Sequence, residues 1–391
     1  MRNRLFPAVL ILLFLLGAGI FVLPQKENSV MEKRPLATNK DIHLTSFLKD
    51  SESVLKDQFY ARESITKAYY SVKSLLNKPF GSSGSGDGTL DGIDYVFLND
   101  NVLQIDGSYL LNNILLYDEE KAYLATSRAY NVSEFDKTYP DIKTYVYFPT
   151  RLEEILDVGE DLNYGPAYRA SFINQFNEKI TWDELKIRNV EDYESFFQKS
   201  DFHWNARGAY QGYSDIINMI RKDYDIDEPR KIYEEIAYDY EFRGNISSQV
   251  GMQGEADHIT DLKLEGIGDY TYTVNGVEKD LWDTKRDYAE HGNDTQYSDF
   301  DYYFGDNAFL RIFDFHQEDK PDLLIIGDSF INVTQEWIAS HFDKTVIVDL
   351  RAREDGFSLK KLIEDYDVDI ALVTMYYQNL YFNGNMYIPL D

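Results

Sequence analysis

The sequence contains no cysteine. Disulfide bonds, thiolate nucleophiles and cysteine-ligated zinc sites are therefore excluded. Basic residues are also sparse: 39 lysines and arginines stand against 68 aspartates and glutamates, so the formal net charge is −29. Because nucleic acids and anionic membrane surfaces attract basic patches, this balance argues against either as a partner. The six histidines are scattered without a metal-ligand spacing, and we predict no metal site.

Long apolar runs are confined to the amino terminus. Residues 5–23 carry no charge and follow two arginines. A run of this length can cross a bilayer and exceeds the core of most signal peptides. It predicts a signal anchor, with a transmembrane helix over residues 1–24 and a polar stalk over 25–44. Removal of this segment as a signal peptide is the alternative, because residues 17–19 are small as a cleavage site requires, although they lie inside the apolar run.

Residues 45–391 show no repeat of fixed period, which argues against a solenoid. Short apolar runs bounded by turn residues predict buried strands, and they alternate with segments of helical spacing. This alternation is typical of α/β layers, with a mostly parallel sheet and helices on both faces. The predicted strands are 143–149, 323–326, 345–349 and 370–376. The predicted helices lie over 45–77, 118–130, within 152–179, over 191–198, after Asn205 and over 358–366.

Two segments have a different character. Residues 224–300 are acidic and rich in tyrosine, with glycine-containing turns and a hairpin pattern near 270–276. We predict that this segment is an insertion with β character, lying outside the main sheet. Residues 93–111 alternate between apolar and polar and predict a second hairpin, turning at residues 99–101.

A serine occupies a special position after one of the buried strands. The run 323–326 ends at Gly327, which permits a tight turn, and a helical pattern begins just after Ser329. Ser329 is therefore expected between a strand end and a helix start, where its backbone N–H and the helix dipole can stabilise an oxyanion. Two interpretations of Ser329 follow: it is a nucleophile, or it only caps the helix. Asp328 is expected to cap the same helix.

A serine nucleophile needs a base, and His203 is the obvious candidate. It precedes a helical pattern that Asn205 is placed to cap, and the positive end of that helix favours a neutral imidazole. Asp201, two residues earlier, is placed to accept a hydrogen bond from Nδ1 and select the tautomer. A buried structural histidine and a metal ligand are the alternatives for His203.

The motif Asp-x-His-Trp at 201–204, together with Gly-Asp-Ser-Phe at 327–330, resembles the SGNH-hydrolase-like polysaccharide O-acetyltransferases. This group contains alginate acetylation proteins and the DHHW proteins of Gram-positive bacteria. Tyr-Tyr-Phe-Gly at 302–305 and Val-Asp-Leu-Arg at 348–351 support the resemblance, which covers residues 45–391. The sequence departs from the pattern in having Phe202 in place of a second histidine. It also lacks recognisable glycine and asparagine blocks of SGNH esterases, so the rest of the oxyanion hole stays unassigned.

The resemblance implies a three-layer SGNH-like, flavodoxin-like fold in permuted form, because acid and base precede the nucleophile. It implies that Ser329, His203 and Asp201 form a catalytic triad without a cofactor. It further implies an O-acetyltransferase or acetylesterase that forms an acyl-enzyme and acts on a cell-envelope polysaccharide. The large domain is then extracellular, anchored by its single N-terminal span, with a multi-pass membrane O-acyltransferase as a partner that supplies acetyl groups.

Four further residues at predicted strand or motif ends are candidates for binding the substrate. Tyr376, Tyr377 and Trp204 combine a flat apolar ring with a polar tip, which suits sugar rings. Arg351 either binds an anionic or carbonyl oxygen or pairs with one of the many carboxylates. A different class of function also stays open: an inactive subunit that binds polysaccharide or serves as a scaffold on the same fold.

Overall fold

The computed structural model describes scattered residues between 25 and 58 and then residues 87–90, 93–99, 102–112, 115–156, 163–281, 308–354 and 356–390. The predicted membrane span, the motif at 302–305, most of the predicted helix 45–77 and the second part of the predicted insertion lie outside these residues. Within the described residues, no helix is both long enough and apolar enough to span a bilayer.

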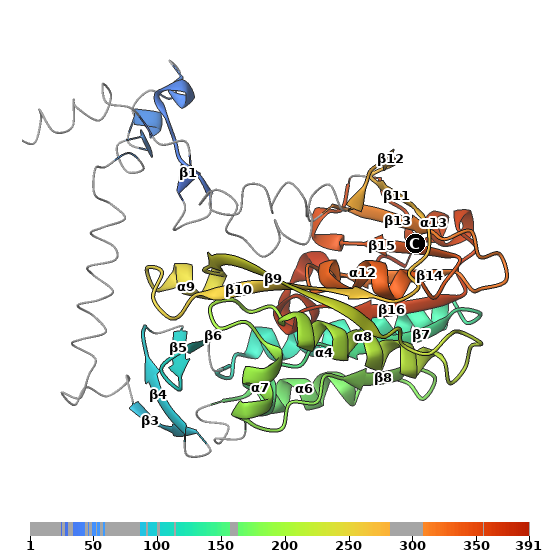
Figure 1. Cartoon of the computed structure of the whole chain (residues 1–391), viewed down its shortest axis with the longest axis horizontal. Coiled ribbons are helices and arrows are strands. Elements are labelled where there is room, and N and C mark those ends of the chain that lie inside the picture. Colours follow the sequence, from blue (N-terminus) through green and yellow to red (C-terminus); the bar gives the residue numbers. More distant parts are fainter. Residues whose placement is uncertain are drawn as a thin grey trace, which may run out of the picture.

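The described residues form one large mixed sheet of eight strands (Figure 1). Strands β15, β14, β16, β7 and β8 run parallel to one another, whereas the pairs β13–β15, β11–β13 and β11–β12 are antiparallel. All four strands predicted from the sequence lie in this sheet, so the mostly parallel α/β architecture is confirmed. In spatial order the strands are β12 (Val277–Glu278), β11 (Thr271–Val274), β13 (Leu310–Asp314), β15 (Lys344–Val348), β14 (Leu323–Gly327), β16 (Ile370–Thr374), β7 (Lys143–Phe148) and β8 (Thr181–Glu184).

Helices cover both faces of the sheet. Helix α12 (Ile331–Ala339) leads from β14 to β15, whereas α13 (Leu359–Asp365) leads from β15 back past β14 to β16. Because parallel crossovers are right-handed, these two opposite directions place α12 and α13 on opposite faces. Helix α8 (Ala206–Ile220) packs beside α12 (Figure 1). On the other face, α4 (Glu119–Thr138) packs against α6 (Gly165–Ile173), which belongs to the β7–β8 crossover.

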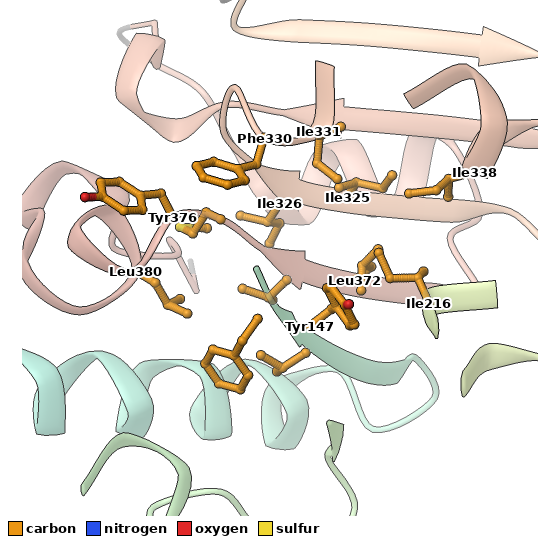
Figure 2. Close-up of a cluster of buried hydrophobic side chains, with 14 of the residues drawn as sticks. Tyr147, Ile216, Ile325, Ile326, Phe330, Ile331, Ile338, Leu372, Tyr376 and Leu380 are labelled. Atoms are coloured by element: carbon orange, nitrogen blue, oxygen red, sulfur yellow. The ribbon is translucent and has the colours of Figure 1, made fainter. Parts of the chain in front are cut away.

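The centre of the core lies between β14 and its neighbouring elements. Figure 2 shows Ile325 and Ile326 of β14 with Leu372 of β16 and Tyr147 of β7. All four side chains are completely buried, as are Ile331 and Ile338 of α12. Burying each such side chain contributes about 1.5–3 kcal/mol, so the strand before Ser329 is anchored from both faces.

Besides a short pairing of β1 (Asn28–Ser29) with β2 (Arg34–Pro35), the described residues form two smaller sheets. The first is antiparallel and contains β3 (Asp87–Leu90), β4 (Ile93–Phe97), β5 (Val102–Ile105) and β6 (Tyr109–Asn112). The hairpin predicted over 93–111 is thus part of a larger antiparallel sheet. The second is a two-stranded ribbon of β9 (Ile232–Phe242) and β10 (Asp257–Leu264). The remaining elements used below are α5 (Leu152–Ile155), α7 (Val190–Phe196), α9 (Asn245–Gln249), η4 (Leu350–Ala352) and η5 (Gln378–Phe382).

The predicted insertion at 224–300 does not lie wholly outside the main sheet. The ribbon β9–β10 is separate, but β11 pairs along its length with β13, so Thr273 lies opposite Ile312. Strand β13 itself was not predicted. Its addition to β15 leaves an open edge, and β11 covers that edge with threonine, tyrosine and valine, residues that suit a strand. The predicted hairpin near 270–276 is confirmed, with Asn275 and Gly276 at positive φ in the turn.

Candidate active site

Ser329 lies in the turn between β14 and α12. At Gly327 an added Cβ would come within 2.9 Å of the Ile331 side chain and 3.0 Å of the Thr374 carbonyl oxygen, so the turn requires glycine. Ser329 is 3% exposed, and its backbone N–H has no acceptor among the described residues. The strand, turn and helix predicted around Ser329 are therefore present, and an unengaged backbone donor lies beside its hydroxyl.

The imidazole of His203 connects Ser329 with Asp201. Its Nε2 lies 2.8 Å from Ser329 Oγ, and its Nδ1 lies 2.6 Å from Asp201 Oδ1. The backbone N–H of His203 also donates to Asp201 Oδ1, at 3.0 Å. Both His203 and Asp201 are completely buried. A proton on Nδ1 satisfies the carboxylate and makes Nε2 the acceptor for the proton of the serine hydroxyl.

Local structure before α8 determines where His203 points. Asn205 caps α8, as predicted, by accepting hydrogen bonds from the backbone of Arg207 and Gly208. The chain turns back on itself just before this cap, where Phe197 and Trp204 form a β-bridge and Gln198 donates to the His203 carbonyl oxygen. The loop that carries Asp201 and His203 is therefore closed by backbone hydrogen bonds.

The second oxygen of Asp201 is held by the start of α9. Asn245 donates its backbone N–H to Asp201 Oδ2 at 2.6 Å. The preceding residue, Gly244, packs so closely that an added Cβ would lie 2.2 Å from Asp201 Cβ and 2.3 Å from Oδ2. Its own N–H donates to Ser200 Oγ at 2.9 Å. The carboxylate of Asp201 is therefore fixed from a segment more than forty positions away.

Asp257 of β10 holds the residues just before Asp201. It accepts hydrogen bonds from the backbone of Lys199 and Ser200 and from the Ser200 hydroxyl. Burial raises the pKa of Asp257 to about 6, although these hydrogen bonds oppose the shift. Gly244, Asn245 and Asp257 were not predicted as site residues, and no local pattern distinguishes them from ordinary turn and strand residues.

Asp328 joins the serine turn to the end of β16. Its Oδ1 accepts from the Phe330 backbone at 3.0 Å, while its Oδ2 accepts from the Tyr376 backbone and from Asn379 Nδ2, both at 2.8 Å. The predicted cap is not found, because the N-cap residue of α12 is Phe330 and the helix start has no side-chain cap; Asp328 instead connects two neighbouring strand ends. Its contacts hold the serine turn against the segment that carries Tyr376.

Aromatic side chains pack beside the imidazole of His203. Phe202 stacks on Tyr376, with ring centroids 5.0 Å apart, and also lies 4.3 Å from the imidazole. The Phe330 ring lies 4.9 Å from the imidazole and 6.3 Å from the Phe202 ring, and Figure 2 shows it beside the ring of Tyr376. The buried guanidinium of Arg151 donates to the Phe202 carbonyl oxygen and pairs with Glu153. These packed rings exclude water from the imidazole–carboxylate contact.

The four residues predicted to bind the substrate are packed or paired within the protein to a greater extent than the sequence suggested. Trp204 is completely buried, and its ring fills the space beside Gly212, so it lines no cleft. Tyr376 is 4% exposed and stacks on Phe202, while Tyr377, 2% exposed, packs edge-on against Tyr376 with ring centroids 4.5 Å apart. Arg351 of η4 forms an ion pair with Asp349, with Nη2 2.6 Å from Oδ2, which favours the carboxylate-pairing alternative.

Comparison with known proteins supports the fold. No family model and no curated protein matches the sequence. PatB1 of Bacillus cereus, solved with a sulfonyl adduct, aligns over 73% of this chain and 97% of its own with a TM-score of 0.59 and 19% identity. A DHHW family protein from Eubacterium siraeum aligns over 78% of this chain and 97% of its own with a TM-score of 0.54 and 15% identity. The mixed α/β fold with a large parallel sheet is therefore shared with both of these proteins.

Proposed function

We propose that this protein is a serine-dependent O-acyltransferase that moves acetyl groups onto a cell-envelope polysaccharide. The observation that carries the proposal is the continuous contact from Ser329 Oγ through the imidazole of His203 to Asp201. An accidental helix cap at Ser329 would not require a buried histidine, oriented by a buried carboxylate, at hydrogen-bond distance from its hydroxyl. The likeness in fold to the DHHW protein agrees with the motifs at 201–204 and 327–330.

In the first half of the reaction, Ser329 Oγ attacks the carbonyl carbon of the acetyl donor while its proton passes to His203 Nε2. Asp201 keeps Nδ1 protonated and stabilises the imidazolium that forms. The tetrahedral oxyanion accepts a hydrogen bond from the Ser329 backbone N–H, and one such donor is worth roughly 3 kcal/mol. Collapse of this intermediate expels the leaving group, which takes the proton from Nε2, and the acetyl group remains on Ser329.

In the second half, a sugar hydroxyl gives its proton to His203 Nε2 and attacks the acetyl-serine. Collapse of the second tetrahedral intermediate breaks the bond to Ser329 Oγ, which recovers the proton, and releases the acetylated sugar. Water in place of the sugar would give an acetylesterase. The close packing of Phe202, Phe330 and Tyr376 around the imidazole supports transfer, because a site with little water favours a bound hydroxyl.

The order of the triad along the chain also belongs to the proposal. Asp201 and His203 precede Ser329, which reverses the order of SGNH esterases, so we assign the domain to a permuted form of that fold. We further propose that residues 1–24 anchor the enzyme, that its domain is extracellular and that a membrane O-acyltransferase is the donor. Protease added to intact protoplasts tests this topology: it should degrade residues 45–391, and full protection would refute the extracellular placement.

The reaction is tested with the soluble domain, 4-nitrophenyl acetate and an oligosaccharide acceptor, followed by mass spectrometry of protein and sugar. The expected results are an acetyl group on the peptide containing Ser329 and acetylated oligosaccharide. Methanesulfonyl fluoride should modify the same serine, in line with the sulfonyl adduct of PatB1. A well-folded protein that neither releases nitrophenol nor reacts at Ser329 would favour the inactive polysaccharide-binding subunit.

A further inference from the structure

A cleft of about 460 Å³ lies on the α12 side of the molecule, apart from the triad residues. Its walls come from the ribbon β9–β10, from β11 and the edge strand β12 with the segments beside them, and from the carboxyl half of α12. The volume falls within the range of about 300–1,000 Å³ typical of small-molecule sites. No residue of the cleft takes part in the chemistry proposed above.

The floor of the cleft combines apolar surface with one buried carboxylate. Trp337, Leu262 and Leu264 line it and are at most 3% exposed. Glu336 is 6% exposed, and its Oε1 accepts a hydrogen bond from the Tyr270 hydroxyl at 2.7 Å. Among the described residues no lysine or arginine pairs with Glu336. A carboxylate in such a place is stabilised by hydrogen-bond donors, and a ligand hydroxyl or amide can supply them.

The rim of the cleft offers an aromatic face. Tyr233 lines the cleft and is 58% exposed, so much of its side chain is available for stacking. Lys263, on the neighbouring strand, is held by an ion pair with Glu234 at 2.9 Å. An exposed tyrosine above a polar floor suits a pyranose ring, whose C–H face packs on the aromatic ring while its hydroxyls form hydrogen bonds.

The charges around the cleft select among sugars. Its lining residues include four carboxylates against two lysines: Asp269, Glu278, Asp280 and Glu336, with Lys263 and Lys279. A uronate or phosphorylated sugar would be repelled by this excess of negative charge. Uncharged hexoses and N-acetylhexosamines would not, and their hydroxyl and amide groups can donate to the carboxylates.

The cleft shares a helix with the nucleophile. Ser329 immediately precedes α12, and Glu336 lies near the end of that helix. Seven residues of helical rise span about 10 Å, a distance that a sugar chain of a few units can bridge. We propose that this cleft is a subsite for an uncharged segment of the acceptor polysaccharide, which positions the chain relative to Ser329. This inference rests on the proposed function for its link to acetyl transfer.

The test measures the affinity of the full domain for chitotetraose and cellotetraose by calorimetry, with trigalacturonate as the anionic comparison. Tyr233→Ala should weaken binding of the neutral tetrasaccharides roughly tenfold, because a stacking face is lost. Tyr233→Phe should retain most of the affinity, and Glu336→Gln should weaken it. Tyr123→Ala removes a tyrosine that is 71% exposed on α4, outside the cleft, and should bind like the wild type.

The outcomes separate the subsite from the proposed reaction. Ser329→Ala should abolish ester turnover while binding the tetrasaccharides as the wild type does. Binding that depends on Tyr233 in a protein without any acyl turnover would retain the subsite and refute the enzyme. The subsite would be refuted if the protein transferred acyl groups but Tyr233→Ala and Glu336→Gln bound the neutral oligosaccharides as tightly as the wild type. It would also be refuted if the wild type bound neither tetrasaccharide, or if it preferred trigalacturonate.

Discussion

His203 Nε2 lies 2.8 Å from Ser329 Oγ, although the two residues are 126 positions apart in the chain. One comes from the loop before α8 and the other from the turn before α12, and these two helices pack side by side. The packing of α8 on α12 therefore brings the proposed base and the proposed nucleophile together. Disturbing either loop should affect catalysis before it affects the fold.

Replacing either partner in this contact should remove activity without unfolding the protein. Ser329→Ala and His203→Ala should each lower kcat for acetyl ester turnover by roughly 10⁴-fold or more, because each disables proton transfer to the imidazole. The double variant should be little worse than either single one. Steady-state kinetics with circular dichroism check this, and losses that multiply in the double variant would show that the two residues act separately.

The carboxylate of Asp201 should matter through orientation and charge. Asp201→Asn keeps the shape of the side chain but cannot both accept from His203 Nδ1 and neutralise an imidazolium. We expect kcat to fall by roughly 10⁴-fold while the affinity for the ester changes little. Measuring kcat and KM of Asp201→Asn and of the wild type tests this role. A variant in which only KM changes would contradict it.

Gly244 provides a test of positioning from outside the triad. Gly244→Ala would place a methyl group 2.3 Å from Asp201 Oδ2, so either the carboxylate or the start of α9 must move. We expect a loss of activity of at least tenfold, with the fold retained. Gly384→Ala is the matched control, since no atom lies within 4 Å of its added Cβ. Equal activity of the two variants would mean that this contact does not orient Asp201.

The acid stability of the protein should depend on His341. Its Nε2 lies 2.8 Å from the Tyr213 hydroxyl, and burial, assisted by nearby Arg230, lowers its pKa to about 3. The folded state thus favours the neutral imidazole. The neutral imidazole of His341 therefore makes its full contribution to the free energy of unfolding above the unfolded pKa of about 6.5. This contribution is lost as the pH falls toward 3, and the total loss is at most ~5 kcal/mol.

Urea unfolding between pH 7 and pH 4 measures this dependence. The free energy of unfolding of His341→Gln should fall less steeply with acid than that of the wild type, because a glutamine does not titrate. His258→Gln, a change at an exposed histidine on β10, should retain the steep wild-type dependence. Parallel curves for the wild type and His341→Gln would refute the assignment.

The sequence alone predicted the features that depend on residues close together in the chain. The run 323–326 and the glycine after it predicted the strand and turn at Ser329, and Asn205 predicted the start of α8. Such features can be recognised because burial leaves a short apolar pattern and a helix start needs a capping side chain within a few residues. The two motifs then indicated which histidine and aspartate belong with the serine.

Other features depend on which distant segments pack together, and only the tertiary structure decided them. Strand β11 belongs to the main sheet because the open edge of β13 accepts it, and Trp204 is buried because Gly212 of α8 makes room for its ring. Asp201 is held by Gly244 and Asn245, whose local sequence resembles any turn before a helix. Backbone pairing at an edge and close packing leave no local pattern, since each depends on a surface that exists only once the chain has folded.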